Sequence, residues 1–269
     1  MDEYGRFAEV YDLLMEEIPY EDWCRYLTGL LKKYGVDDGL VCELGCGTGT
    51  MTELLSEAGY DMTGIDASEE MLQKALEKRE KSGLPILYLL QDMREIELYG
   101  TMRAFVSVCD SMNYLTERED FTEVLRLVNN YLDPGGVFIF DLKTEHFFRD
   151  VLGDSTSGAS EEHAAYILEN TYDEELKLNS SFLTVFEEDE DGRFERFTEL
   201  HEQRAYPVQE IREMAEEAGL AFAGAYSAFT EDPPGNKEGQ EERIYIVLKE
   251  VLKTEIPGIL KEAKGQTAV

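Results

Sequence analysis

Apolar residues near the start of the chain recur at helical spacing, and short apolar runs then alternate with helical stretches. Residues 4–34 carry the helical spacing, with an interruption at Ile18 and Pro19, which predicts two helices. An apolar run at 39–44 enters a glycine cluster, and a helical pattern follows over 51–58. This order predicts a strand, a tight loop and a helix, the unit that opens a parallel sheet.

The alternation of strands and helices continues to about residue 142. Helices are predicted at 68–81 and 118–131. Further strands are predicted at 61–65, 86–90, 104–109 and 136–142. Because strands that alternate with helices build a doubly wound sheet, we predict an α/β protein with a Rossmann-like, mostly parallel sheet.

Beyond residue 142 the pattern changes to longer strand-like runs joined by acidic turns. These runs predict an antiparallel meander, which we interpret as a small inserted β cap, with strands at 166–172, 178–187 and 194–204. A helix and a terminal hairpin then complete a seven-stranded main sheet, with elements at 207–218, 220–229 and 243–248.

The predicted domain organisation follows from this change of pattern. Residues 1–143 and 207–250 form the main domain, and residues 144–206 form the inserted antiparallel cap. Residues 251–269 are predicted to be a C-terminal tail, because they lack a clear hydrophobic period.

Acidic residues greatly outnumber basic ones, with 58 Asp and Glu against 25 Lys and Arg and a formal net charge of −33. Such a surface repels phosphate backbones and anionic lipid headgroups, so we predict no nucleic acid partner and no membrane partner. The four cysteines form no paired C-x-x-C pattern, and no metal site is predicted. Without a signal-peptide pattern or an apolar run of about 20 residues, the protein is predicted to be cytoplasmic.

The strongest chemical signal is the segment ELGCGTG at 43–49, where the first predicted strand of the sheet meets the next helix. Glycines at this point let a ligand approach the backbone closely. A plain strand-to-helix turn is one alternative. A dinucleotide site is another, although Thr50 stands where the G-x-G-x-x-G pattern requires its third glycine.

Two acidic residues follow the next two predicted strands. Asp66 ends the second strand, and its carboxylate can accept hydrogen bonds from both hydroxyls of a ribose, although it could also cap the next helix. Asp92 follows the third strand, where it can accept a hydrogen from an adenine amino group while Met93 packs against the ring. Several classes of nucleotide site use an acid at the position of Asp66, so this residue alone does not identify the cofactor.

Taken in order, these motifs resemble the class I S-adenosylmethionine-dependent methyltransferases over about residues 4–142 and, more weakly, 207–248. The matching segments are ELGCGTG (43–49), GIDAS (64–68), QDMR (91–94), CDS (109–111) and LDPGG (132–136). Two further segments resemble a bacterial subgroup, the YqeM-like proteins: Y-x-x-F-A-x-x-Y-D at 4–12 and H-x-Q-R-x-Y at 201–206. The resemblance implies S-adenosyl-L-methionine as the cofactor and methyl transfer as the reaction.

The resemblance also implies which residues surround the cofactor. They are Glu43, Gly45, Gly47, Asp66, Asp92, Met93 and Asp110. The first helix, with Tyr4 and Tyr11, is implied to cover the cofactor. We include Cys46, Ala67 and Met71 in the same predicted site because they lie within or beside these motifs.

Methyl transfer from a sulfonium chiefly requires the nucleophile to lie in line with the bond between sulfur and the methyl carbon. If the acceptor is an amine or a hydroxyl, a base can remove its proton, and the candidates are His201, Tyr11 and Tyr206. The alternative for His201 is an ordinary position on the surface or in the core of the cap.

Two further residues are candidate substrate contacts. Arg204 either holds a substrate carboxylate or forms a surface ion pair, and Asn113, beside Tyr114, either lies near the transferred methyl group or caps a turn. We predict methyl transfer to a nitrogen or oxygen of a small-molecule acceptor by a monomer or homodimer. An NAD-dependent oxidoreductase and a non-catalytic cofactor-binding module are the alternatives.

Overall fold

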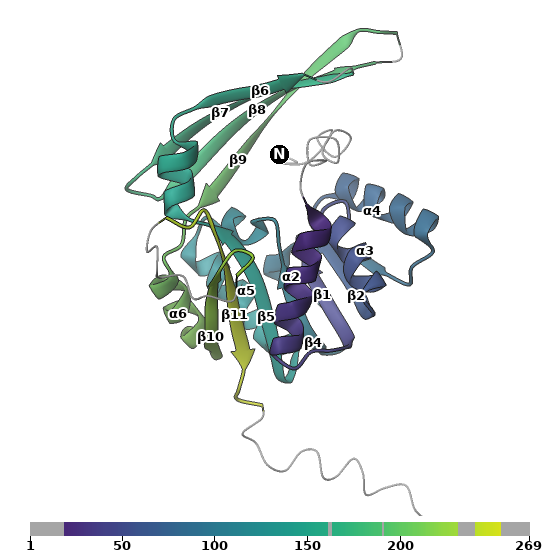
Figure 1. The fold of residues 1–269 in the computed structure, drawn as a ribbon, viewed down its shortest axis with the longest axis vertical. Coiled ribbons are helices and arrows are strands. Elements are labelled where there is room, and N and C mark those ends of the chain that lie inside the picture. The colour runs from purple at the N-terminus through teal and green to yellow at the C-terminus, as the bar shows by residue number, and fades with distance from the viewer. Residues whose placement is uncertain (1–18, 161–162, 190, 231–239, 254–269) are drawn as a thin grey trace, which may run out of the picture.

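The computed structural model describes residues 19–160, 163–189, 191–230 and 240–253, and these residues form two separate sheets (Figure 1). The helices are α2 (Tyr20–Lys33), α3 (Thr50–Glu57), α4 (Glu69–Ser82), η1 (Met93–Glu95), η2 (Ser111–Tyr114), α5 (Arg118–Tyr131), η3 (Phe147–Leu152) and α6 (Val208–Glu217). The main sheet contains β1 (Gly39–Leu44), β2 (Tyr60–Asp66), β3 (Leu87–Leu90), β4 (Met102–Ser107), β5 (Leu132–Lys143), β10 (Leu220–Ser227) and β11 (Arg243–Glu250). The second sheet contains β6 (Thr156–Ser160), β7 (Ala164–Asp173), β8 (Leu178–Glu188) and β9 (Phe194–Arg204).

The main sheet has the strand order β10-β11-β5-β4-β1-β2-β3. Neighbouring strands from β5 to β3 are parallel, and β11 alone runs antiparallel to its neighbours β5 and β10. This arrangement confirms the predicted mostly parallel seven-stranded α/β fold. The direction of strand progression reverses between β1 and β4, and in such sheets the carboxyl ends of the strands at this point form the ligand crevice.

The two faces of the main sheet are buried by different helices, because successive residues of a strand point to opposite sides. Phe138 and Phe140 of β5 pack in a cluster with residues of α5 and α6. Val137 and Ile139 pack on the other face with residues of α2 and α3. The central strands are therefore covered on both sides, which explains their continuous apolar sequences.

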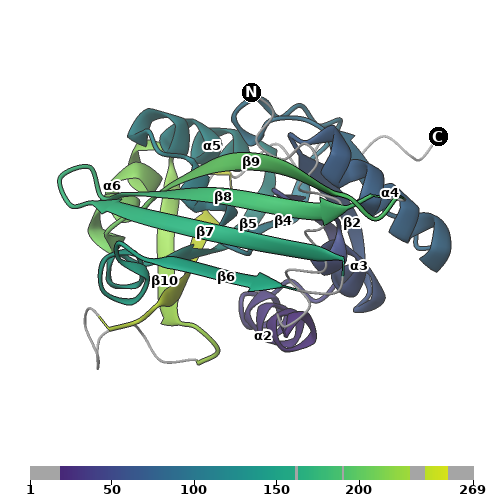
Figure 2. The ribbon, with the colours of Figure 1, turned by 90° about the horizontal axis from the view of Figure 1, so that it is seen from above.

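The four antiparallel strands lie in the chain between β5 and α6, and the cap that they form extends over the carboxyl edge of the main sheet (Figures 1 and 2). The predicted meander is present as β7, β8 and β9. The edge strand β6 was not predicted, because its sequence TSGAS is exposed throughout and carries no hydrophobic alternation.

The observed limits of the main-sheet elements agree closely with those predicted from hydrophobic spacing. The helix at 118–131 has the predicted limits, and the helix beginning near residue 69 is capped by Ser68, whose Oγ accepts a hydrogen bond from the Met71 N–H at 3.2 Å. The predicted first helix and most of the predicted tail lie outside the described residues. Within the described part of the chain, no helix combines the length and the apolar character needed to cross a membrane.

Candidate active site

A pocket of about 770 Å³ lies between the carboxyl edge of the main sheet and the inner face of the cap. The loops after β1, β2, β3 and β4 line one part of it, and residues of β7, β8 and β9 line the other. Its size is typical of a small-molecule site. Eleven predicted site residues line this pocket: Glu43, Gly45, Cys46, Gly47, Asp66, Ala67, Met71, Asp92, Met93, Asp110 and His201.

The glycine loop after β1 turns through three glycines with positive φ, 68° at Gly45, 53° at Gly47 and 79° at Gly49. A Cβ at Gly45 would lie 2.7 Å from Ser111, and one at Gly49 would lie 2.3 Å from the Tyr88 hydroxyl. These two glycines are therefore required by the protein's own packing. A Cβ at Gly47 would meet no described atom within 4 Å, so Gly47 is where the loop leaves room for a ligand.

Asp66 ties the end of β2 to the glycine loop. Its Oδ2 accepts a hydrogen bond from the Gly47 N–H at 2.7 Å, and its Oδ1 accepts one from the Ser68 N–H at 2.9 Å. Burial raises the pKa of Asp66, and these backbone hydrogen bonds oppose the rise. Because Ser68 itself caps α4, the carboxylate of Asp66 is held at the pocket wall instead of serving as that cap.

Glu43 is the most deeply buried acid of the glycine-loop region, with only 2% of its surface exposed. Its carboxylate accepts a hydrogen bond from the Thr52 hydroxyl on α3. Burial raises the pKa of Glu43 to about 8, the Thr52 hydrogen bond opposes the rise, and the nearby charge of Asp66 adds to it. A cationic ligand in the pocket would favour the ionised carboxylate.

Asp92 and Met93 follow β3 at the same edge of the sheet. The Asp92 carboxylate accepts hydrogen bonds from the backbone N–H and the guanidinium of Arg94, at 2.8 and 3.0 Å. The hydrogen bond from the Arg94 side chain is the main reason that the pKa of Asp92 is lowered. The Met93 methyl group lies 3.5 Å from the Cβ position of Gly45, so this side chain reaches the glycine loop.

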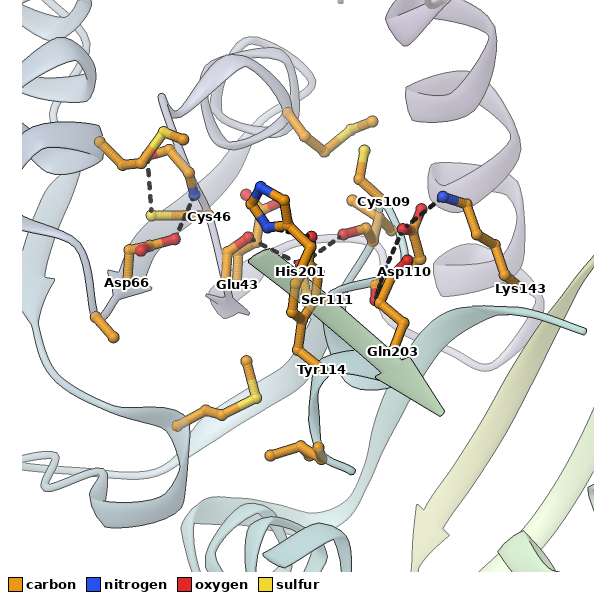
Figure 3. Close-up of a pocket in the computed structure, with 18 of the residues that line it drawn as sticks. Glu43, Cys46, Asp66, Cys109, Asp110, Ser111, Tyr114, Lys143, His201 and Gln203 are labelled. Atoms are coloured by element: carbon orange, nitrogen blue, oxygen red, sulfur yellow. Dashed lines mark hydrogen bonds and ion pairs between the residues drawn. The ribbon is translucent and has the colours of Figure 1, made fainter. Parts of the chain in front are cut away.

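A buried charge cluster surrounds Asp110, which follows β4. Cys109 and Asp110 both adopt left-handed backbone conformations, with φ of 59° and 57°. The Asp110 carboxylate lies 3.0 Å from Lys143 Nζ and 2.7 Å from an Arg243 guanidinium nitrogen, and it accepts a 2.7 Å hydrogen bond from the Gln203 side chain (Figure 3). Burial raises the pKa of Asp110, but the two cations outweigh this effect and lower it to about 2.

Three residues of this cluster were missed as site residues by the sequence analysis. Lys143 ends β5, Gln203 is the second-last residue of β9, and Arg243 begins β11. The only signal for any of them was Gln203 in the H-x-Q-R-x-Y segment. Arg243 also pairs with Asp141, whose carboxylate accepts the Asp110 N–H at 2.9 Å. These links join the main sheet to the cap.

The cap contributes an apolar surface and a histidine to the pocket. Tyr166, Leu168 and Leu183 line it from β7 and β8. His201 of β9 is buried, with its Nδ1 3.4 Å from the Tyr114 hydroxyl and its Nε2 3.3 Å from a Glu199 carboxylate oxygen. His201 and Tyr114 lie between the glycine loop and the Asp110 cluster in Figure 3.

Asn113, Arg204 and Tyr206 are not among the described residues that line this pocket, and their predicted roles in substrate binding or proton transfer stay predictions. The Asn113 amide bonds the backbone of Lys143 on β5 and the Arg204 carbonyl on β9, the latter at 2.8 Å. The Arg204 guanidinium pairs with Glu210 at 2.9 Å.

Tyr206 is 4% exposed and its hydroxyl donates to a backbone carbonyl, that of Leu115. Burial raises the pKa of Tyr206, so its hydroxyl stays protonated. Asn113, Arg204 and Tyr206 therefore fasten the cap to the main sheet. Tyr4 and Tyr11 lie outside the described residues.

Known proteins are similar to this chain in sequence and in fold. A methyltransferase domain family matches residues 41–136. The chain is 37% identical over 246 residues to "Putative methyltransferase YqeM" of Bacillus subtilis, covering 90% of this chain and 95% of that protein. A solved S-adenosylmethionine-dependent methyltransferase from Clostridium acetobutylicum is 27% identical, with a TM-score of 0.80 over 92% of this chain and 99% of that one.

The structure of CalS10, an amino pentose methyltransferase from Micromonospora echinaspora with S-adenosylmethionine bound, shares the fold at 18% identity, with a TM-score of 0.68 over 90% of this chain and 97% of that one. The chain belongs to the S-adenosylmethionine-dependent methyltransferases, and within them to the family of YqeM. S-Adenosyl-L-methionine is its cofactor, and the alternative of an NAD-dependent oxidoreductase is excluded by this membership.

Proposed function

We propose that this methyltransferase transfers the methyl group to a nitrogen or oxygen atom of a small-molecule acceptor held beneath the cap. The observation that carries this proposal is the continuity of the pocket, which runs from the glycine loop to the inner face of the cap. A pocket covered by a sheet of this kind encloses a small molecule and excludes water from the reacting atoms.

The residues on the sheet side of the pocket fit S-adenosylmethionine. The space at Gly47 admits the cofactor close to the backbone, and Asp66 offers the remaining lone pairs of its carboxylate to ribose hydroxyls. Glu43 supplies a buried carboxyl that favours a cationic ligand. Asp92 and Met93 line the same pocket, and we assign them to the adenine. When bound, the cofactor supplies an electrophilic methyl group.

The small size of the acceptor is supported by charge as well as by the cap. With a net charge of −33, the protein offers little attraction to a polyanion such as nucleic acid. The similarly folded CalS10 is named for an amino pentose, a small acceptor, although that likeness extends to the fold alone.

Calorimetry with S-adenosylhomocysteine tests the cofactor residues. We expect Asp66→Ala to weaken binding by about 10-fold or more, because a hydrogen bond to a charged group is worth ~1.5 kcal/mol. Asp61→Ala, an exposed acid on the same strand, is the matched control and should bind as the wild type does. Unchanged binding by a folded Asp66→Ala protein would show that the ribose assignment is wrong, and NAD binding of equal strength would contradict the cofactor site.

The acceptor class is tested by radiolabelled methyl transfer from S-adenosylmethionine. Small amines and phenols on one side, and bulk tRNA on the other, are offered to the wild-type protein. We expect label in the small molecules only. Label transferred to tRNA, with binding that weakens steeply as salt increases, would overturn the small-molecule proposal.

A further inference from the structure

We propose that Tyr114, His201 and Glu199 form a proton relay that removes a proton from the methyl acceptor. Tyr114 is the catalytic residue that meets the acceptor, His201 takes the proton from Tyr114, and Glu199 is a positioning residue for His201. The inference rests on the proposed function, because it assigns the acceptor end of the same pocket.

The position of Tyr114 places its hydroxyl between the cofactor loop and the cap. Tyr114 ends η2, which begins at Ser111, and the Ser111 hydroxyl donates to the Gly45 carbonyl at 3.3 Å. The turn is thereby fixed against the glycine loop. The Tyr114 side chain is half-buried and lines the pocket, directly below His201 in Figure 3.

Glu199 and His201 are neighbours on the inner face of β9, because residues two apart in a strand point to the same side. The Glu199 side chain is only 7% exposed and the His201 side chain 9%. A buried carboxylate requires a hydrogen-bonded or charged partner. Glu199 Oε2 and His201 Nε2 lie 3.3 Å apart, but neither atom makes a hydrogen bond to a described residue, so the contact becomes an ion pair only when His201 takes up a proton.

In the proposed relay, the proton of neutral His201 lies on Nε2, the ring nitrogen that faces Glu199 at 3.3 Å. The lone pair of Nδ1 is then directed at the Tyr114 hydroxyl, 3.4 Å away. A base oriented by a third group is the arrangement that activates a hydroxyl in many unrelated enzymes.

The proton balance of the step is complete within these residues. The acceptor nitrogen or oxygen forms a bond to the methyl carbon while the bond from that carbon to sulfur breaks, and its electron pair remains on sulfur. The proton of the acceptor passes to the Tyr114 oxygen, and the proton of Tyr114 passes to His201 Nδ1. The resulting imidazolium is stabilised by the Glu199 carboxylate, so the positive charge lost by the sulfonium is retained in the pocket.

The relay points to a substrate class. An alcohol, a phenol or a neutral amine carries a proton that must leave during or after methylation. The relay supplies the base that takes this proton. A carboxylate acceptor has no such proton. We therefore infer a hydroxyl or amine as the methylated group.

Nitrogen-15 NMR of histidine tests the arrangement without any acceptor. The chain has three histidines, and the signals of exposed His163 and of His146 are assigned with His163→Gln and His146→Gln. At pH 8, with S-adenosylhomocysteine added, we expect the His201 proton on Nε2 and a changed pattern in Glu199→Gln. The outer-face variant Glu169→Gln should leave the signal unchanged. A proton on Nδ1, or no response to Glu199→Gln, overturns the relay.

Turnover gives the second measurement, with tyramine as the probe because it carries both an amine and a phenol. We expect Tyr114→Phe and His201→Ala to lower kcat about 100-fold and Glu199→Gln roughly 10-fold, with cofactor affinity within about twofold. Exposed Tyr99→Phe is the control. Retained kcat in Tyr114→Phe overturns the relay. Failure of the wild type to bind S-adenosylhomocysteine would instead contradict the proposed function, and the NMR result would still report the geometry.

Discussion

The main sheet and the cap are built on different physical principles. The main sheet is buried on both faces by extended apolar clusters that include α2, α3, α5 and α6. The cap has a small apolar cluster of its own, around Ala164, Leu183 and Val185, and part of its inner face, with His201 and Gln203, lines the pocket. The main sheet thus obtains its stability from its own core, whereas the inner face of the cap is available for chemistry.

The difference explains why polar residues are concentrated where the two parts meet. Gln203 of β9 donates to Asp110, and the Asn113 amide bonds the backbone of both β5 and β9. Directional bonds of this kind fix the position of the cap more specifically than apolar contact does. The cap can therefore hold His201 over the glycine loop without a large core beneath it.

The largest expected effect distinguishes the two cores. Phe140→Ala removes a fully buried ring that packs on Phe121 and Phe138, and we expect a loss of about 3–5 kcal/mol in the free energy of unfolding. Leu183→Ala in the cap should cost only about 2 kcal/mol, because its pocket side offers fewer contacts to lose. Urea unfolding followed by circular dichroism measures both, and equal losses would contradict the comparison.

The second prediction concerns the buried charge cluster around Asp110, where the cap meets the main sheet. Arg243→Met leaves Asp110 and Asp141 buried with a reduced positive charge, and we expect a loss of about 3 kcal/mol at pH 7. Lys143→Met, which removes the more exposed cation, is the matched control and should cost less.

The pH dependence of this effect has a definite sign. The pKa of Asp110 is held near 2, so its stabilising contribution in the wild type is present above its ordinary value near 3.8 and is lost as the pH falls through 2. In Arg243→Met the loss of stability comes from burying the charges of Asp110 and Asp141 without this cation. That loss becomes smaller when one of the two carboxylates is protonated. The difference from the wild type should therefore shrink between pH 7 and pH 5, and a widening difference would argue against the cluster.

A pH-dependent effect of comparable size is expected at Glu43, on the cofactor side. Its pKa is raised from an ordinary 4.5 to about 8, so the folded protein binds more protons than the unfolded chain between these values. Stability should fall as the pH rises through this window, by up to ~1.4 kcal/mol for each pH unit, and the variant Glu43→Gln should flatten the curve. Unfolding measured at pH 5.5 and pH 8 decides this, and parallel curves would show that Glu43 is ionised throughout.

The smallest effect is expected for an ion pair remote from both cores and the pocket. Arg118 of α5 lies 2.6 Å from Glu217, just where α6 ends, and both side chains are substantially exposed. Glu217→Gln should change the free energy of unfolding by less than about 1 kcal/mol, and added salt should reduce the difference. A larger loss would mean that the helices of the main sheet depend on surface charge as well as on burial.

The sequence by itself determined the main sheet and the cofactor side of its pocket. Period and turn chemistry are local properties, so the glycine loop at 43–49 and the acids Asp66 and Asp92 could be placed at the carboxyl edge by counting strands and helices. The same reasoning located β7, β8 and β9 through their alternation, and it missed β6 because that strand buries nothing.

Only the tertiary structure decided the acceptor side. Asp110 and Arg243 are 133 positions apart in the sequence, and no local sequence pattern predicts that they pair. On β9 the alternation puts Glu199, His201 and Gln203 on one face, but the packing of the cap on the main sheet decides that this face meets the pocket. The side chains of Tyr206 and Arg204, which belong to the same segment 201–206, lie instead where the cap is fastened to the main sheet. Strand period fixes which residues share a side, whereas long-range packing decides what that side touches.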